Sequence, residues 1–202
     1  MKDVIIIGAG GHARVIADIV MAQSDRVLGF LDDNPEAVGA FGIPVLGKVA
    51  DYAAYPNASF VIGIGNAQVR RRIAQMLEGV SWYTAIHPSA VISPLGVTLG
   101  AGTVVAANAC INPGATVGAH CIINTASVVE HDNSIADFAH ISVGAKLGGG
   151  ASVGESTWVG IGATVSNGVS VCRDCMLGAG AVAVKDITQP GTYVGVPARR
   201  LP

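Results

Sequence analysis

Aliphatic side chains recur at every sixth position through the second half of the chain. Fourteen successive positions are Leu, Ile or Val: Leu99, Val105, Ile111, Val117, Ile123, Val129, Ile135, Ile141, Leu147, Val153, Val159, Val165, Val171 and Leu177. Four residues after nearly every one stands a small or short side chain, from Thr103 to Ala181. This strict period disfavours a β-sandwich, whose strands alternate with a period of two. It is typical of a parallel β-helix built from hexapeptide repeats.

The repeat predicts a left-handed triangular prism over residues 83–202. Each hexad forms one short strand and one corner, and three hexads complete a coil, so the aliphatic residues stack in the interior and the small residues fill its narrow parts. Gly often follows the aliphatic position directly, and we expect it to supply the backbone angles of the corners; examples are Gly100, Gly118, Gly148, Gly154, Gly160 and Gly178. Weaker hexads begin around His87, which gives about five coils.

Residues 1–82 follow a different pattern, in which apolar runs alternate with helical segments. We expect a buried strand at Val4–Ile7, a tight glycine turn at Gly8–Ala13 and a helix from Ala13 to about Ala22. A second strand, Arg26–Leu31, leads into two aspartates. A third strand at Phe60–Ile64 and a basic helix from Ala67 to about Leu77 follow. Such βαβ alternation predicts a small Rossmann-like α/β domain with a parallel sheet.

The glycine turn of this domain has the spacing of a phosphate-binding loop. Gly8, Gly10 and Ala13 match G-x-G-x-x-A, and Asp32 ends the next strand. The motif places an anion at a helix N-terminus, where backbone N–H groups hold it. Because about 80 residues supply only half of a doubly wound dinucleotide domain, a nucleoside diphosphate is favoured over NAD. A glycine turn without a ligand remains the alternative.

Composition argues against several other classes of protein. The net charge of −2 gives no basic surface for nucleic acid, and no apolar run reaches the roughly 18 residues of a membrane span. Four cysteines without a paired framework favour a reducing, cytoplasmic compartment. Cys172 and Cys175 form a lone CxxC, a weak metal or redox signal, and no His/Cys set has metal-ligand spacing, so we expect no metal.

Several segments together resemble one family. They are GAGGHA at 8–13, LDD at 31–33, GIGN at 63–66, Asn124–Asp132, Phe138–Ala145 and Gly195–Arg200. The chain resembles, over nearly its whole length, the sugar acetyltransferases that include sialic acid O-acetyltransferases and the UDP-4-amino-sugar N-acetyltransferases of bacillosamine biosynthesis. The segments 124–132 and 138–145 are most similar to the amino-sugar enzymes.

The resemblance implies a reaction and a site. The reaction is acetyl-CoA-dependent N-acetylation of the 4-amino group of a UDP-linked 4-amino-4,6-dideoxy sugar; O-acetylation of a sugar such as sialic acid and a non-catalytic nucleotide-sugar-binding module are the alternatives. His131 is implied as the general base, and Asp132, where the family commonly has Glu, as the group that raises its basicity. The implied acetyl-CoA contacts are His140, Ile161 and Ala179, and the implied nucleotide-sugar contacts are Gly10, Gly11, His12, Asp32, Asp33 and Gly65.

The residues themselves are compatible with this chemistry. Imidazole titrates near neutrality and suits a general base, although His131 could also be an ordinary exposed side chain and His140 a packing residue. His131 lies outside both interior ladders, so its ring should face outward. A backbone N–H of the Gly144 region is one candidate for the oxyanion donor, whose position the sequence leaves open. The outward apolar side chains, Val104, Val128, Val143, Trp158 and Ile161, require a covering surface. The resemblance points to a homotrimer with acetyl-CoA between adjacent chains.

Overall fold

A five-stranded parallel sheet forms the N-terminal part of the protein. The computed structural model describes residues 1–202 throughout. The sheet has the order β3-β2-β1-β4-β5, and its elements are β1 (Asp3–Ile7), α1 (Gly11–Ala22), β2 (Arg26–Leu31), β3 (Val45–Gly47), the 3₁₀ helix η1 (Val49–Ala54), β4 (Ser59–Ile62), α2 (Ala67–Met76) and β5 (Ser81–Trp82). Strand β1 is almost wholly apolar because both its faces are covered, one by α1 and the other by η1 and α2.

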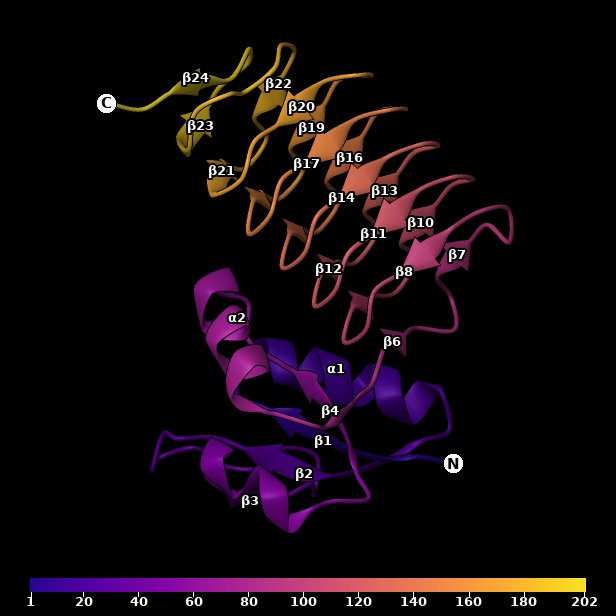
Figure 1. Ribbon diagram of the computed structural model, residues 1–202, viewed down its shortest axis with the longest axis vertical. Helices are drawn as coiled ribbons and strands as arrows, with labels where there is room; N and C mark the ends of the chain where they lie inside the picture. Colours follow the sequence, from indigo (N-terminus) through magenta and orange to yellow (C-terminus); the bar gives the residue numbers. More distant parts are fainter.

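The remainder of the chain winds into a three-sided β-helix, seen as stacked coils in Figure 1. The first face contains β6 (Ala85–Ile86), β9 (Val104–Val105), β12 (Ile122–Ile123), β15 (His140–Ile141), β18 (Trp158–Val159), β21 (Cys175–Leu177), β23 (Gly191–Val194) and β24 (Arg199–Arg200). The second contains β7 (Val91–Ile92), β10 (Cys110–Ile111), β13 (Val128–Val129), β16 (Lys146–Leu147), β19 (Thr164–Val165) and β22 (Val182–Ala183). The third contains β8 (Thr98–Leu99), β11 (Thr116–Val117), β14 (Ser134–Ile135), β17 (Ser152–Val153) and β20 (Ser170–Val171).

The interior of the prism consists of the two predicted ladders. Every aliphatic position from Val105 to Leu177 is at most 3% exposed, and the small residues from Thr103 to Ala181 are at most 7% exposed. The predicted hexapeptide β-helix is therefore confirmed. The repeat begins at β6, slightly before His87. The first coil contains one extra residue: Ile86 pairs with Val105, 19 positions later, whereas Leu99 pairs with Val117, 18 positions later.

The glycines that directly follow the aliphatic positions do not have the role we expected. They have no left-handed backbone angle; instead, they let successive coils approach closely, since a Cβ on Gly118 would lie 2.7 Å from the nitrogen of Asp137. The left-handed angles occur elsewhere, at every sixth residue from Gly96 to Gly180. Seven of these fifteen positions are not glycine: Asn108, His120, Ala126, Asp132, Phe138, Ser156 and Asp174. Backbone strain at the corners is thus part of the repeat.

The α/β domain packs against the first face and the third–first edge of the prism (Figure 1), with contacts that extend from β6 to Asp174. One apolar cluster runs across the junction and joins side chains of α1 to Tyr83, Ala85 and Val104. Val104 is therefore 1% exposed and does not contribute to the exposed apolar surface to which the sequence assigned it. Trp158 and Ile161 remain exposed, at 36% and 60%.

Candidate functional site

His131 and Asp132 lie on the edge between the second and third faces. The side chains are 60% and 73% exposed, and His131 Nδ1 lies 2.8 Å from Asp132 Oδ2. This hydrogen bond, helped by the negative charges of Asp132 and Glu130, holds the pKa of His131 above its ordinary value. The carboxylate reaches the ring although it is one methylene shorter than Glu. A histidine bound through Nδ1 presents Nε2 to a substrate.

The stacking of the coils determines where this pair lies. His131 rests on Gly149 of the next coil, since a Cβ there would contact Nε2 and lie 2.6 Å from Cε1. Asp132 lies against Gly114 of the preceding coil, where a Cβ would be 2.6 Å from Oδ1. The two glycines leave the space that the imidazole and the carboxylate occupy. Gly149 escaped the sequence analysis, although the run Gly148-Gly149-Gly150, one coil after His131, was a usable signal.

The backbone N–H groups of Gly144 and Gly149 differ in whether they are already bonded. The N–H of Gly144, on the first–second edge, donates to Thr125 O at 2.9 Å and is not free to hold an oxyanion. The N–H of Gly149, on the second–third edge beside His131, donates to no other group of the chain. Ile161 and Ala179 both lie on the first–second edge, between β18 and β19 and between β21 and β22.

The predicted nucleotide-binding residues gather at the carboxyl ends of the parallel strands. Gly10 caps α1, and Gly65 precedes α2. A Cβ on Gly10, Gly11 or Gly65 would contact nothing within 4 Å, so the space above both helix N-termini is open. Such an edge is where open α/β sheets bind ligands.

Asp32 and Asp33 shape this edge differently. Asp32 accepts hydrogen bonds from Ala9 N at 2.7 Å and Asn34 N at 2.8 Å, so both its oxygens hold the backbone of the loops. Asp33 uses one oxygen, which accepts from Val49 N at 3.0 Å. Both aspartates, together with Arg72, line a cavity of about 430 Å³. Arg72 is a further candidate for contact with a bound nucleotide, and the sequence did not point to it.

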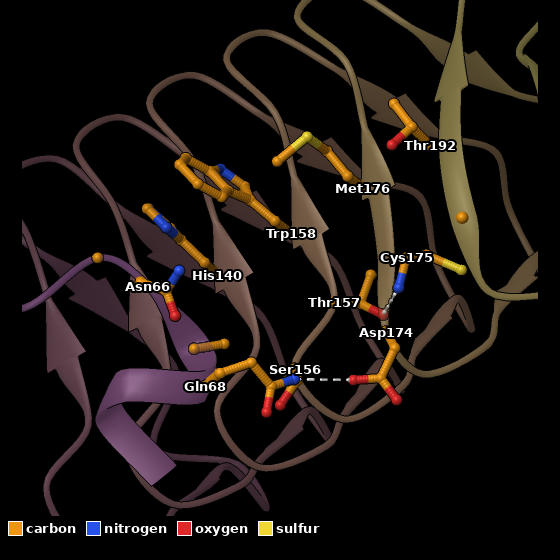
Figure 2. A pocket seen from close by; sticks show the side chains of 13 residues that line it. Asn66, Gln68, His140, Ser156, Thr157, Trp158, Asp174, Cys175, Met176 and Thr192 are labelled. Carbon is orange, nitrogen blue, oxygen red and sulfur yellow. Dashed lines mark hydrogen bonds between the residues drawn. The ribbon is translucent and has the colours of Figure 1, made fainter. Parts of the chain in front are cut away.

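A second cavity of about 300 Å³ lies between the first turn of α2 and the first face (Figure 2). Gly65, Asn66 and Gln68 form one wall, and His140, Trp158 and Met176, which follow one another on adjacent strands, form another. The rings of His140 and Trp158 are stacked at 4.9 Å and 16°. The cavity thus brings Gly65 of the α/β domain and His140 of the β-helix into one site, which the sequence alone did not show.

His140 and His12 meet where the two domains join. Their ring centroids are 6.4 Å apart, and His140 Nε2 lies 3.1 Å from Asn124 Nδ2. His140 Nδ1 and His12 Nε2 are buried without a hydrogen-bond partner. Burial and the positive charge of Arg70 lower the pKa of His140 to about 3 and that of His12 to about 4. Both rings are therefore neutral at pH 7.

His131 does not share this neighbourhood within one chain. The α/β domain contacts the first face and the third–first edge, whereas His131 lies on the second–third edge, opposite the first face. The structure therefore brings together His12, His140 and the loops predicted to bind the nucleotide, but leaves His131, the implied general base, apart from them.

The comparisons with known proteins agree with this architecture. Residues 3–77 match the family model of the PglD N-terminal domain. Over 100% of this chain and 98% of the other, the structure is similar to a mutant of perosamine N-acetyltransferase from Caulobacter crescentus in complex with CoA and GDP-perosamine, with 35% identity and a TM-score of 0.95. The acetyltransferase domain of PglB from Neisseria gonorrhoeae matches over 100% of both chains, with 34% identity and a TM-score of 0.94.

The chain belongs to the hexapeptide-repeat sugar acetyltransferase family. Among curated relatives, the UDP-N-acetylbacillosamine N-acetyltransferase of Bacillus subtilis is 39% identical over 115 residues, which cover 53% of this chain and 52% of that protein. Another curated relative, from Acanthamoeba polyphaga mimivirus, is matched over only 21% of its length. The chain thus matches about half or less of these curated relatives.

Three further observations concern the membrane, cysteine and metal expectations drawn from the sequence. None of the helices has the length and apolar character needed to cross a membrane. Cys172 and Cys175 are free thiols whose sulfur atoms lie 3.4 Å apart, and burial raises the pKa of the Cys175 thiol to about 12. No group of three or more His, Cys, Asp or Glu side chains is placed to hold a metal ion.

The buried histidines predict that stability depends on pH. The pKa of His12, His120 and His140 lies at about 3 to 4 in the folded protein, whereas unfolded histidine titrates near 6.5. The contribution of these neutral rings to the free energy of unfolding is present above about pH 6.5. It is lost as the pH falls toward 4, because the unfolded chain takes up protons that the folded chain does not. We expect urea unfolding midpoints to fall steadily over this range.

His120→Asn should reduce the steepness of that fall, because Asn does not titrate and tolerates the left-handed backbone angle at this position. Urea titrations at several pH values measure both effects. An equally steep fall in the variant and the wild type would contradict the assignment for His120.

Proposed function

We propose that the protein transfers the acetyl group of acetyl-CoA to the 4-amino group of a UDP-linked 4-amino-4,6-dideoxy sugar. The observation that carries the proposal is the similarity over the whole chain to N-acetyltransferases, combined with an exposed His131 whose Nδ1 is held by Asp132. One relative is named for UDP-N-acetylbacillosamine, and another was solved in complex with GDP-perosamine. Sugar amines therefore form the acceptor class, and O-acetylation is the alternative to be tested.

In the proposed reaction His131 is the general base. Its Nε2 takes a proton from the neutral amine as the nitrogen attacks the thioester carbonyl, and Asp132 stabilises the imidazolium that forms. The N–H of Gly149, next to the imidazole, is the free backbone donor available to the oxyanion. The thiolate of CoA then leaves, and the imidazolium can return a proton to it.

The polar groups of the sheet edge support UDP as the nucleotide. Both oxygens of Asp32 and one oxygen of Asp33 hold backbone N–H groups, which leaves one carboxylate oxygen without a partner in the protein. Uracil offers one ring N–H, whereas guanine offers a ring N–H and an amino group that are best matched by a two-oxygen carboxylate. The match favours uracil, while the similarity to a GDP-sugar enzyme makes GDP the alternative.

The separation of His131 from the nucleotide-binding loops supports a site shared between chains. We expect a homotrimer in which the second–third edge of one prism brings His131 to the cavity beside His140 of its neighbour, with acetyl-CoA along the first–second edge at Ile161 and Ala179. The exposed side chains of Trp158 and Ile161 fit a surface that another chain covers. A neighbouring chain would also exclude water from the thioester.

The decisive assay measures release of CoA across a panel of acceptors. It compares UDP- and GDP-linked 4-amino sugars, the matching 4-hydroxy sugars, and sialic acid. We expect turnover with a UDP-linked amino sugar at a kcat/KM at least about tenfold above that of its GDP counterpart, equivalent to about 1.4 kcal/mol. Preference for a hydroxyl acceptor would show O-acetylation, and calorimetric binding of nucleotide sugar without any turnover would show a binding module.

Replacement of the base tests the mechanism. His131→Ala should lower kcat by about two to four orders of magnitude, the usual contribution of a general base, while acetyl-CoA affinity changes little. Asp132→Asn should cost less, and because it removes the charge that raises the pKa of His131, the acid limb of its kcat–pH profile should move to lower pH. More than a tenth of wild-type kcat in His131→Ala would contradict the role of this residue.

Mixed oligomers test whether the site is shared. His131→Ala removes the base, and Gly65→Phe fills the cavity without a backbone clash, since nothing lies within 4 Å of a Cβ there. Each variant alone should be nearly inactive. Coexpressed in equal amounts, random trimers should regain about a quarter of wild-type activity per site, because a quarter of the sites pair an intact cavity with an intact base from the neighbour. No recovery in verified mixed trimers would refute the shared site.

A further inference from the structure

Arg70 is buried at the junction of the two domains without a carboxylate partner. It projects from α2, is 1% exposed, and is the largest fully buried side chain of the protein. None of the salt bridges in the chain involves it. A buried charge is costly unless hydrogen bonds compensate it, so its contacts should account for its presence.

All the groups that accept hydrogen bonds from Arg70 are backbone carbonyls, and they belong to both domains. On the side of the α/β domain, Nη1 donates to Gly65 O at 2.6 Å and Ile64 O at 3.2 Å. On the side of the β-helix, Nε donates to His120 O at 3.1 Å, and Nη2 donates to the carbonyls of Phe138 and Ala139. One rigid group thus joins the loop before α2 to two successive coils of the third–first edge.

These contacts lie next to the candidate site. Gly65 lines the cavity described above, and Ala139 immediately precedes His140, which forms part of the opposite wall. The planar guanidinium fixes the direction of every hydrogen bond it makes. Arg70 therefore links the loop at Gly65 directly to the backbone beside His140.

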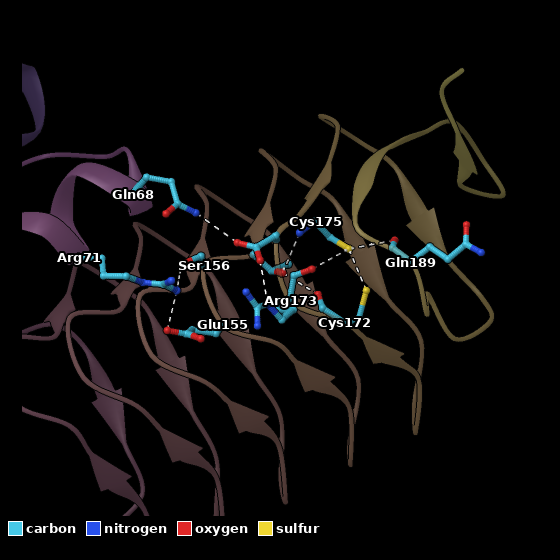
Figure 3. Close-up of polar contacts among 10 residues, drawn as sticks. Gln68, Arg71, Glu155, Ser156, Cys172, Arg173, Cys175 and Gln189 are labelled. Atoms are coloured by element: carbon cyan, nitrogen blue, oxygen red, sulfur yellow. Dashed lines mark hydrogen bonds and ion pairs between the residues drawn. The ribbon is translucent and has the colours of Figure 1, made fainter.

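Other polar links across this junction are weaker. Gln68 donates to Asp174 Oδ1 at 3.2 Å, and Arg71 contacts Glu155 and donates to Ser156 Oγ at 2.8 Å, as Figure 3 shows. The side chains of Arg71 and Glu155 are 24% and 38% exposed, so solvent screens their attraction. Elsewhere on the junction, Gln23 Oε1 accepts from Tyr83 Oη at 2.9 Å and from Ile86 N at 3.1 Å. Among the side chains that make polar links across the junction, Arg70 is the most deeply buried, at 1% exposure.

Packing alone does not explain an arginine here. Burial lowers the pKa of Arg70 to about 10, which shows that its charge is poorly solvated. An apolar side chain of similar length would fill the same space without that cost, but it would leave the carbonyl oxygens that accept from Arg70 without this donor. What an apolar side chain does not supply is a fixed orientation of one domain relative to the other.

We propose that Arg70 is a positioning residue that sets the loop at Gly65 in register with His140, and so aligns the bound nucleotide sugar with the acetyl donor. The inference rests on the proposed function, because it concerns the same site. Its consequence is specific: loss of Arg70 should impair the use of nucleotide sugar, whereas acetyl-CoA, held by the β-helix, should bind normally.

The test uses Arg70→Met, which keeps the length of the side chain, and Arg70→Lys, which keeps its charge but lacks a fork that reaches both domains. The controls are Arg71→Met at the same junction and Arg26→Met in an exposed ion pair with Asp3. Steady-state kinetics with both substrates give kcat and KM, and calorimetry with CoA alone gives its affinity without turnover.

We expect both Arg70 variants to lower kcat/KM for the nucleotide sugar at least about tenfold, with CoA affinity within about twofold of wild type, and both controls to stay within about threefold in kcat/KM. If Arg70→Met does not fold, Arg70→Lys decides. Wild-type kinetics in the folded Arg70 variants, or an equal loss of CoA binding, would overturn the role of Arg70 alone. A wild-type protein without transferase activity would overturn the proposed function and this role together.

Discussion

The stacking of each coil on the next, eighteen residues further along the chain, is the constraint on which the rest of the structure depends. Parallel strand pairs keep this register from Thr98 to Ala183, so a residue and its counterpart one coil away lie directly beside each other. A site in such a fold is built from residues at equivalent positions of adjacent coils, such as His131 and Gly149 or His140 and Trp158. The backbone that carries them is rigid, which is what a preorganised site requires.

The same regularity separates His131 from the predicted nucleotide-binding loops. Each face and edge repeats along the axis, so residues on different edges do not approach one another within one prism. His131 and these loops are on opposite sides of the prism. In the mechanism that we propose, a second prism therefore has to bring the base to the acceptor, and oligomerisation becomes part of catalysis. Within the chain, the placement of the α/β domain is held by the apolar cluster across the junction and by the buried contacts of Arg70.

The sequence predicted most of the fold because its periodicity is almost perfect. The aliphatic ladder, the α/β domain and the outward direction of His131 all followed from spacing. The close-approach role of Gly118 did not follow, because sequence does not distinguish a glycine that needs a left-handed angle from one that leaves space. Arg70 escaped for a related reason: in the sequence it is one of three consecutive arginines on a basic helix, and only the packing shows which of them is buried.

The contact between His131 and Asp132 depends on the strain of the repeat. Asp132 occupies one of the left-handed corner positions, with φ of 59°, where Asp is tolerated better than most residues because its short polar side chain can bond locally. Gly114 leaves room for the carboxylate, and the 2.8 Å hydrogen bond to Nδ1 follows. A corner that costs stability in an ordinary coil here orients an imidazole. The period of six therefore explains both why the chain folds as it does and why a carboxylate directly following a histidine can hold it.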